Sequence, residues 1–168
     1  MIIMIIYAAV SFLLDGLMSN YFSTFIVNPS YFRTIYSVIA LVVMFNYFDN
    51  KTKYLYILGG LGVLFDIVYT NTFILNIVIF LIIYLFLNIM DYYLSNNVFT
   101  TNIKAILSII IYHVVSYLIF LLVHYQNYTR ELLWLILVRS IIMTIVYTMV
   151  SYFVMKKIYS KKYDKRVK

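Results

Sequence analysis

The sequence predicts an all-α integral membrane protein: a six-helix transmembrane bundle with short loops and with both termini in the cytoplasm. Hydrophobic residues make up 65% of its 168 positions, charged residues only 11%, and the mean hydropathy is +0.95. Soluble domains contain about 45–50% apolar and about 25% charged residues, so this chain holds more apolar side chain than a soluble core of its size could bury. Its apolar stretches also recur between short polar breaks, and most approach the roughly 20 residues that cross a bilayer.

Six apolar stretches are expected to form the spanning helices, in the order Ile2–Val27, Phe32–Phe48, Tyr54–Tyr69, Phe73–Tyr92, Ile103–Val123 and Leu132–Met155. The breaks between them carry a proline at Asn28–Ser30, charges at Asp49–Lys53 and several asparagines at Ser95–Asn102, all of which interrupt regular structure. The breaks are short, so consecutive helices should pack as neighbours. A membrane β-barrel is rejected because polar and apolar residues alternate along its strands, whereas these stretches are apolar at odd and even positions alike.

This organisation gives one six-span transmembrane domain over residues 1–155 and a basic cytoplasmic tail over residues 156–168. The chain has no cysteine, so disulfides, thiolate metal sites and cysteine nucleophiles are excluded. It also lacks a P-loop, a His-Glu-x-x-His motif, a Gly-x-Ser-x-Gly motif and carboxylates spaced for acid–base catalysis. We therefore expect a protein that is not an enzyme, with no catalytic residue, no metal and no cofactor.

The basic residues predict the orientation. With the N-terminus inside, the cytoplasmic side holds Lys51, Lys53, Lys104 and the tail, whereas the outside holds only Arg33 and Arg130. This is the excess of positive charge expected on cytoplasmic segments. The basic residues of the tail are Lys156, Lys157, Lys161, Lys162, Lys165, Arg166 and Lys168. Because the tail directly follows a span, we expect it to bind anionic lipid headgroups rather than nucleic acid, at about 1 kcal/mol per basic residue near the surface.

Within the expected spans, Asp15, Asp66, His113 and Arg139 need an explanation, because a charged residue at a helix centre costs about 2.5–3.5 kcal/mol on insertion scales. Asp66 shares one face of its helix with Gly59 and Gly62, since the offsets are seven and four residues. The two glycines should allow another helix to approach closely. This face is therefore a predicted helix-docking groove that ends in a carboxylate.

Asp66 is expected to pair with Arg139, which lies near the outer end of the last helix and has a side chain long enough to reach outward. A bond between a guanidinium and a carboxylate would keep both groups ionised in lipid. The pair could simply fix helix packing, or it could act directly in transport or in partner contact.

Two stripes of polar residues are expected to face protein rather than lipid. One follows the last helix and includes Ser140 and Thr144; the other follows the first helix in steps of four, through Ser11, Asp15 and Ser19. Hydroxyls of this kind bond across helix interfaces. Asp15 could make an interhelical hydrogen bond, or it could be a proton or ion site. His113 is expected to be a buried core residue, with a ligand or proton-shuttle role as the alternative.

The segment Gly59–Thr72, the stretch Leu81–Phe86 and the last span from Arg130 resemble the rod-shape-determining protein MreD family. That family has five or six spans, a Gly-x-x-x-Asp step that ends its third span, and in many members an arginine early in the last span. Gly62 and Asp66 match the step, and Arg139 matches the arginine. The sequence departs from the family at Ile74, where many members have a glycine.

This resemblance implies a non-enzymatic scaffold of the bacterial cell-wall elongation machinery, in the cell membrane. Its implied partners are MreC, the actin-like MreB inside the cell, and RodA with its class B penicillin-binding protein. The rival is the vitamin-binding subunit of an energy-coupling-factor type importer, which also has six spans. Such subunits tend to carry an Ala-x-x-x-Ala face on their first helix, and this sequence lacks that face.

Overall fold

The computed structural model describes residues 2–25, 34–48, 50–70, 72, 74–123 and 129–164, with side chains left undescribed at 19–25 and 160–164. The helices are α1 (Ile2–Phe25), α2 (Tyr36–Phe45), α3 (Lys51–Phe65), α4 (Leu75–Tyr93), α5 (Val98–Leu122) and α6 (Arg130–Asp164). A single π-helical turn, η1 (Asp66–Thr70), continues directly from α3. The described residues contain no strand, so the predicted all-α class is confirmed.

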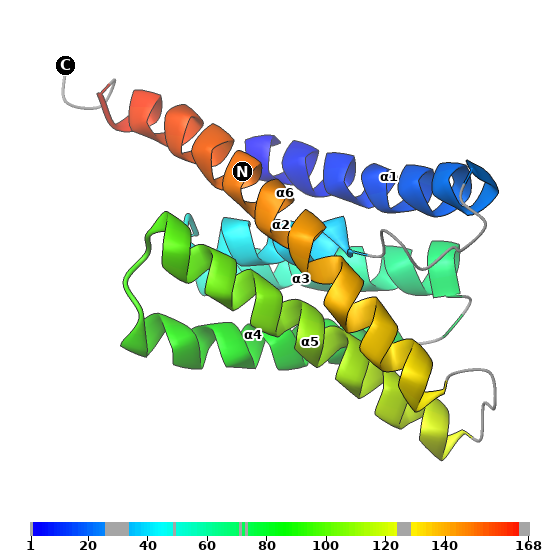
Figure 1. Ribbon diagram of the computed structural model, residues 1–168. Helices are drawn as coiled ribbons and strands as arrows, with labels where there is room; N and C mark the ends of the chain where they lie inside the picture. Colours follow the sequence, from blue (N-terminus) through cyan, green and yellow to red (C-terminus); the bar gives the residue numbers. More distant parts are fainter. Residues whose placement is uncertain are drawn as a thin grey trace.

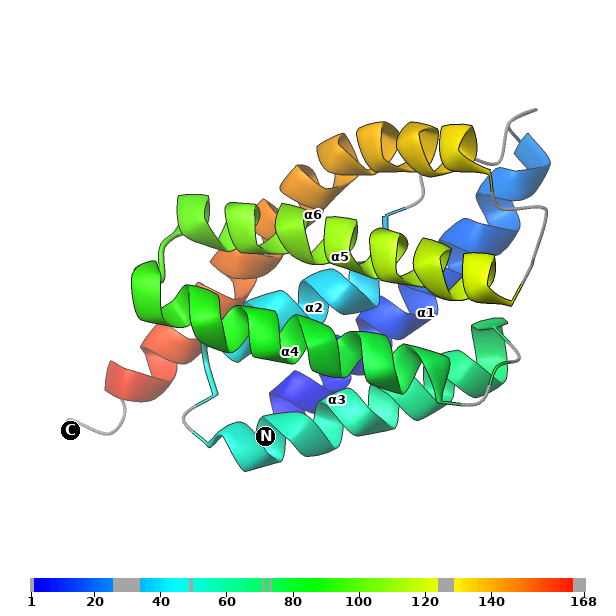
Figure 2. The same ribbon diagram turned by 90° about the horizontal axis from the view of Figure 1, so that it is seen from below.

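The helices run back and forth, and α6 crosses the others obliquely (Figure 1). The closest neighbours are α5 with α6, α3 with α4, and α1 with α2, as expected for helices joined by short connections. The start of α1 and the end of α6 lie toward the end of the bundle where α4 turns into α5, and the end of η1 and the start of α4 lie at the other end (Figures 1 and 2).

Helix α2 is the centre of the molecule. It contacts α1, α3, α4, α5 and α6, and Figure 2 shows it enclosed by them. Each of its ten residues is buried, with no more than 4% of any side chain exposed. A helix that is apolar all round can be stable only when it is surrounded in this way.

Four helical segments are long and apolar enough to cross a membrane: Lys51–Thr70, Leu75–Tyr93, Val98–Leu122 and Arg130–Tyr159. These agree with predicted spans three to six, apart from shifts at their ends. Two shorter apolar helical segments are α2, Tyr36–Phe45, and Ile2–Met18, which is the part of the 24-residue helix α1 with described side chains. The ten residues of α2 extend about 15 Å, half of the roughly 30 Å hydrocarbon core. Four helices of spanning length are therefore shown, compatible with a multi-pass membrane protein.

The last helix does not stop at the predicted boundary between span and tail. Its 35 residues run without a break from Arg130 to Asp164, about 52 Å at 1.5 Å per residue. Lys156 and Lys157 are exposed on it. Lys161 and Lys162 lie on the same helix with undescribed side chains, and Lys165, Arg166 and Lys168 lie outside the described residues. The first part of the predicted tail is therefore a helical extension of α6.

The starts of the helices divide into two kinds. Asn50 and Asn97 cap their own helices, because their side chains accept hydrogen bonds from backbone N–H groups of the first turns of α3 and α5. By contrast, α2 and α4 start after Ile35 and Ile74, which provide no side-chain cap. The first N–H groups of a helix have no partner within the helix, so α2 and α4 need acceptors from elsewhere.

Candidate functional site

The N-terminus of α4 is capped by Asp66, which directly follows α3 and is the first residue of η1. Oδ1 of Asp66 accepts hydrogen bonds from the backbone N–H of Asn76 (2.9 Å), the side-chain amide of Asn76 (2.9 Å) and the hydroxyl of Thr72 (2.7 Å). Only 3% of Asp66 is exposed. A carboxylate at this position also interacts favourably with the positive end of the α4 dipole.

The polar contacts continue from Asp66 into α5. The side-chain amide of Asn76 donates to the Thr70 hydroxyl (3.0 Å), and its carbonyl oxygen accepts from the Tyr112 hydroxyl (2.6 Å). The hydroxyls of Thr70 and Thr72 lie 2.6 Å apart. We call Asp66, Thr70, Thr72, Asn76 and Tyr112 the Asp66 network. It ties η1, α4 and α5 together at one end of the bundle.

The predicted ion pair between Asp66 and Arg139 is not among these contacts. The donors to Oδ1 are neutral groups of the α3–α4 connection and α4, and Oδ2 is buried without a hydrogen-bond partner. The one salt bridge of the described residues joins two other side chains, Lys104 and Asp91. The physical reason for the difference is that a helix N-terminus can stabilise a carboxylate as a counter-ion would.

The turn before α4 contains a strained backbone. Ile74 has φ of 77°, the left-handed region that glycine adopts easily and that a β-branched residue rarely adopts. This is the position at which the sequence departs from the MreD family by lacking a glycine. Residues held in this region cost about 1–3 kcal/mol.

We expect Ile74→Gly to stabilise the protein by about 1 kcal/mol, because it relieves the strain at a side chain that is half exposed. The free energy of unfolding in mixed detergent micelles measures this effect. Ile74→Ala is the control, since alanine keeps a Cβ and should recover less. A loss of stability in Ile74→Gly would contradict the left-handed conformation.

Only one of the two predicted docking glycines is in close contact. A Cβ at Gly62 would lie 2.9 Å from the backbone Cα of Ile77, whereas a Cβ at Gly59 would meet nothing within 4 Å. Gly62 thus allows the first turn of α4 to approach α3, as predicted. The prediction for Gly59 is wrong within the described structure, because helical periodicity gives the face of a residue but not the separation of the two helices there.

These two glycines form a matched pair for mutation. We expect Gly62→Ala to destabilise the protein by about 1–3 kcal/mol, because the backbone of Ile77 must move. Gly59→Ala should instead be neutral or stabilising by up to about 1 kcal/mol, the difference in helix propensity. Thermal unfolding in detergent distinguishes the two variants, and equal losses in both would contradict the close contact at Gly62.

Asp15 caps α2 as Asp66 caps α4. Its Oδ1 accepts from the backbone N–H of Tyr36 (2.7 Å), and its Oδ2 accepts from the backbone N–H of Ser37 (2.9 Å). The expected interhelical hydrogen bond of Asp15 is thereby confirmed, although its donors are backbone rather than side-chain groups. Both aspartates therefore occupy equivalent positions, each at the start of a helix that lacks its own cap.

Tyr69 joins the two capped corners. Its hydroxyl donates to the backbone carbonyl of Phe12 on α1 (2.6 Å), and the two rings lie 4.7 Å apart. A Cβ at Gly16 would lie 2.6 Å from the Tyr69 hydroxyl oxygen, so this glycine makes room for the contact. Tyr69 belongs to η1, and π-helical turns are frequent at functional sites. The corner of α3 and α4 is thus attached to the helix that caps α2.

The polar stripe of α6 faces protein, as predicted. Ser140 and Thr144 are each 1% exposed. The hydroxyls of Thr144 and Thr34 lie 2.7 Å apart, and the Tyr147 hydroxyl lies 2.8 Å from that of Ser11 on α1. The stripe therefore contacts α1 and the segment before α2. Ser19 lies among the residues with undescribed side chains.

His113 is buried on α5, with 6% of its side chain exposed, and its ring packs edge-on against Tyr112 of the Asp66 network. This burial agrees with the expected core position. The described residues contain no group of three or more His, Cys, Asp or Glu side chains that could hold a metal ion.

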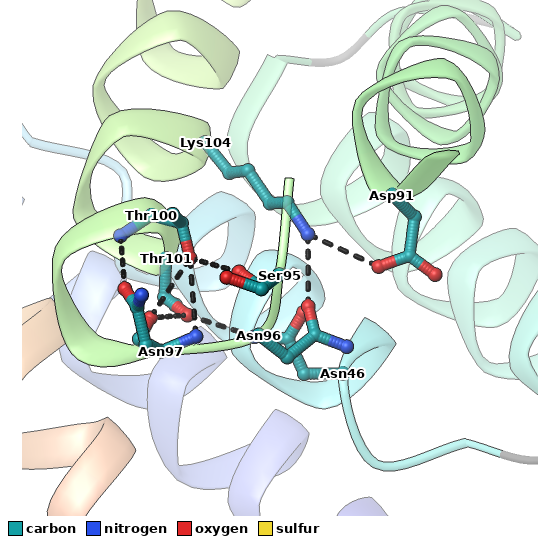
Figure 3. Close-up of polar contacts among 8 residues, drawn as sticks. All are labelled: Asn46, Asp91, Ser95, Asn96, Asn97, Thr100, Thr101 and Lys104. Carbon is teal, nitrogen blue, oxygen red and sulfur yellow. Dashed lines mark hydrogen bonds and ion pairs between the residues drawn. The ribbon is translucent and has the colours of Figure 1, made fainter. Parts of the chain in front are cut away.

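A second polar cluster, which the sequence analysis did not predict, lies at the opposite end of the bundle (Figure 3). Lys104 is fully buried on α5, and its Nζ contacts Oδ1 of Asp91 at the end of α4 (3.1 Å) and Oδ1 of Asn96 in the connection (2.9 Å). The sequence analysis places Lys104 on the cytoplasmic side, as the second residue of the expected span Ile103–Val123. The structure starts α5 at Val98 rather than Ile103, which moves this lysine into the second turn of the helix.

The surrounding residues hold this connection in place. The Asn97 side chain and the Thr100 hydroxyl form a reciprocal cap of α5, with bonds of 2.8 and 3.1 Å, and Thr100 also donates to the carbonyl of Ser95. The Asn46 amide at the end of α2 donates to the Thr101 hydroxyl (2.9 Å). These contacts place Lys104 between the ends of three helices. We call Asn46, Asp91, Asn96, Thr101 and Lys104 the Lys104 cluster.

Comparison with known proteins returned no matching family model, no matching curated protein and no matching solved structure.

Proposed function

We propose that this chain is a non-enzymatic membrane scaffold of the bacterial cell-wall elongation machinery, similar to MreD, which links MreC and the peptidoglycan synthases to the cytoplasmic MreB. The observation that carries the proposal is the corner of α3 and α4. The Gly-x-x-x-Asp step of the resemblance places Gly62 against Ile77 and Asp66 at the start of α4. Ile74, where many family members have glycine, has a glycine-like φ of 77°.

The proposal includes six membrane spans with both termini in the cytoplasm. In support, the start of α1 and the end of α6 lie toward the same end of the bundle (Figure 2), and Lys53, Lys156 and Lys157 are exposed at that end. Most of the described aromatic residues that are more than half exposed lie near the same end, as expected at a membrane interface. They are Tyr56, Tyr92, Tyr93, Phe99 and Phe153, whereas Trp134 is exposed near the start of α6.

The described polar residues are consistent with a scaffold, because Asp15, Asp66 and Lys104 each bind parts of the chain itself. These contacts would hold the helices in fixed positions for partners in the membrane. The exposed lysines of the α6 extension would face anionic headgroups, or a cytoplasmic partner such as MreB.

The importer reading is the second candidate, and a hollow on α6 favours it. The hollow measures about 770 Å³ and is lined, among the described residues, by Arg130, Glu131, Leu133, Trp134, Leu135, Val138 and Arg139. With the N-terminus inside, it would lie toward the outside of the cell, as a solute site of an importer subunit does. Its lining combines four apolar side chains with Arg130, Glu131 and Arg139, and a mostly apolar lining with a few polar groups is usual for small-molecule sites.

Depletion of the protein in its native cell tests both readings. We expect the cells to lose their rod shape while uptake of vitamins continues, and the protein to co-purify with MreC. Re-expression of the wild-type chain should restore the shape. Normal shape together with a growth defect that added vitamin corrects would refute the scaffold proposal and support the importer.

A further inference from the structure

The hollow on α6 combines positive charge with an apolar surface. Arg130 is exposed and Arg139 is half buried, and both line the hollow. They are nine residues apart, about 13 Å along the helix and about half a turn around it, so they flank the apolar strip from opposite sides. Between them, Trp134 and Val138 expose 71% and 52% of their surface. An amphiphile with a charged head and an apolar chain matches this arrangement.

The charges of the lining favour an anionic head. The hollow is lined by two arginines and one acidic residue, Glu131. Glu131 lies in the first turn of α6, where the positive end of the helix dipole partly compensates its charge. A guanidinium has five N–H donors in a planar arrangement that suits phosphate oxygens, so an arginine can bind a phosphate together with a group of the protein.

We propose that this hollow binds an anionic phospholipid, with the headgroup phosphate at Arg130 and Arg139 and an acyl chain along Trp134 and Val138. The long Arg139 side chain can extend from its deeper position toward the headgroup region. The site would hold a specific lipid against the last helix. It requires only that the bundle is embedded in a membrane, so it does not depend on the proposed scaffold function.

Trp134 allows a local test because it is the only tryptophan in the sequence. The full chain is placed in nanodiscs of unlabelled lipid. In one series an increasing fraction of that lipid is replaced by brominated phosphatidylglycerol, and in the other series by brominated phosphatidylcholine. Tryptophan fluorescence is measured in both series. Bromine quenches only at short range. We expect half-maximal quenching at a fraction of phosphatidylglycerol at least about fivefold lower than that of phosphatidylcholine.

Two substitutions distinguish the site from ordinary surrounding lipid. Arg130→Gln and Arg139→Gln should each reduce the preference for phosphatidylglycerol at least about threefold. The double variant Lys156→Gln/Lys157→Gln should keep it, because these lysines are about 33 Å from Trp134 along α6. Arg130 is exposed at the first position of the helix, so Arg130→Gln keeps the test valid if Arg139→Gln does not fold. Equal quenching by the two lipids in the wild type, or a preference that survives Arg130→Gln, would overturn the proposal.

Discussion

Asp66→Ala is expected to lower the free energy of unfolding by about 3–5 kcal/mol, one of the two largest effects of a single substitution in this protein. Loss of a helix cap costs about 0.5–2 kcal/mol, and each buried donor left without an acceptor costs about 1–3 kcal/mol. Asp66 accepts from the backbone and side-chain amides of Asn76 and from the Thr72 hydroxyl. Titration with a denaturing detergent, followed by circular dichroism, measures the loss.

Asp66→Asn is the matched control. In the wild type, Oδ1 of Asp66 accepts all three hydrogen bonds and Oδ2 accepts none. The asparagine side chain can therefore place its oxygen at the position of Oδ1 and its NH₂ group at the position of Oδ2. The interactions of the charge with the α4 dipole and with the backbone N–H of Ile77 are weakened, so we expect a cost of about 1 kcal/mol. If the asparagine variant were as unstable as the alanine variant, the negative charge would be the essential feature. An ion pair would then explain Asp66 better than a cap.

Combining Asp66→Ala with Arg139→Gln tests the original ion-pair hypothesis directly. The structure leads us to expect additive losses, because the hydrogen bonds to Asp66 come from Thr72 and Asn76 rather than from Arg139, and residues that do not contact each other usually act nearly independently. A coupling free energy above about 1 kcal/mol would instead support the ion-pair hypothesis.

The helices could be predicted from the sequence because a lipid environment permits few backbone structures. A chain that exposes no backbone polar groups to lipid must form helices or a closed barrel, and the apolar stretches lack the alternation of a barrel. The ends of the helices were harder to predict, since they depend on caps. Asn97 and Thr100 form a capping box, a pattern present in the sequence that hydropathy alone does not detect.

The partners of the two aspartates could not be predicted from side chains. The sequence analysis looked for an opposite charge, because an isolated carboxylate in lipid is costly. The structure provides backbone N–H groups instead, 21 residues from Asp15 and ten residues from Asp66. Every non-proline residue has such a group, so the sequence gives no sign of which ones are free. The isoleucines at the starts of α2 and α4 are the only local hint that a cap must come from elsewhere.

The Lys104 cluster gives the second large expected effect. Asp91→Leu should lower the free energy of unfolding by about 3–5 kcal/mol, because it leaves a fully buried ammonium group without its counter-ion. Lys51 is close enough to Asp91 and Lys104 to interact with both charges. Without Asp91 it would repel Lys104, which adds to the loss.

Lys104→Met is expected to cost less, about 1–2 kcal/mol, although it breaks the same salt bridge. The Asp91 side chain is 32% exposed, so its carboxylate can be hydrated when the lysine is absent, and methionine can fill much of the space left by the lysine stem. The structure thus predicts an asymmetry: removing the more exposed partner is worse than removing the buried one.

The double variant Lys104→Met/Asp91→Leu should recover to within about 1 kcal/mol of the wild type, because neither charge then remains in the cluster and apolar replacements of buried ion pairs are often neutral. A double-mutant cycle of unfolding free energies in detergent measures this coupling, with the exposed Lys53→Met as the control for loss of a lysine. If Lys104→Met were the costlier single change, its hydrogen bond to Asn96 or the packing of its stem would matter more than the charge pair. If the double variant did not regain the stability of the wild type, the hydrogen bonds of the cluster, rather than the neutralisation of Lys104, would explain its contribution to stability.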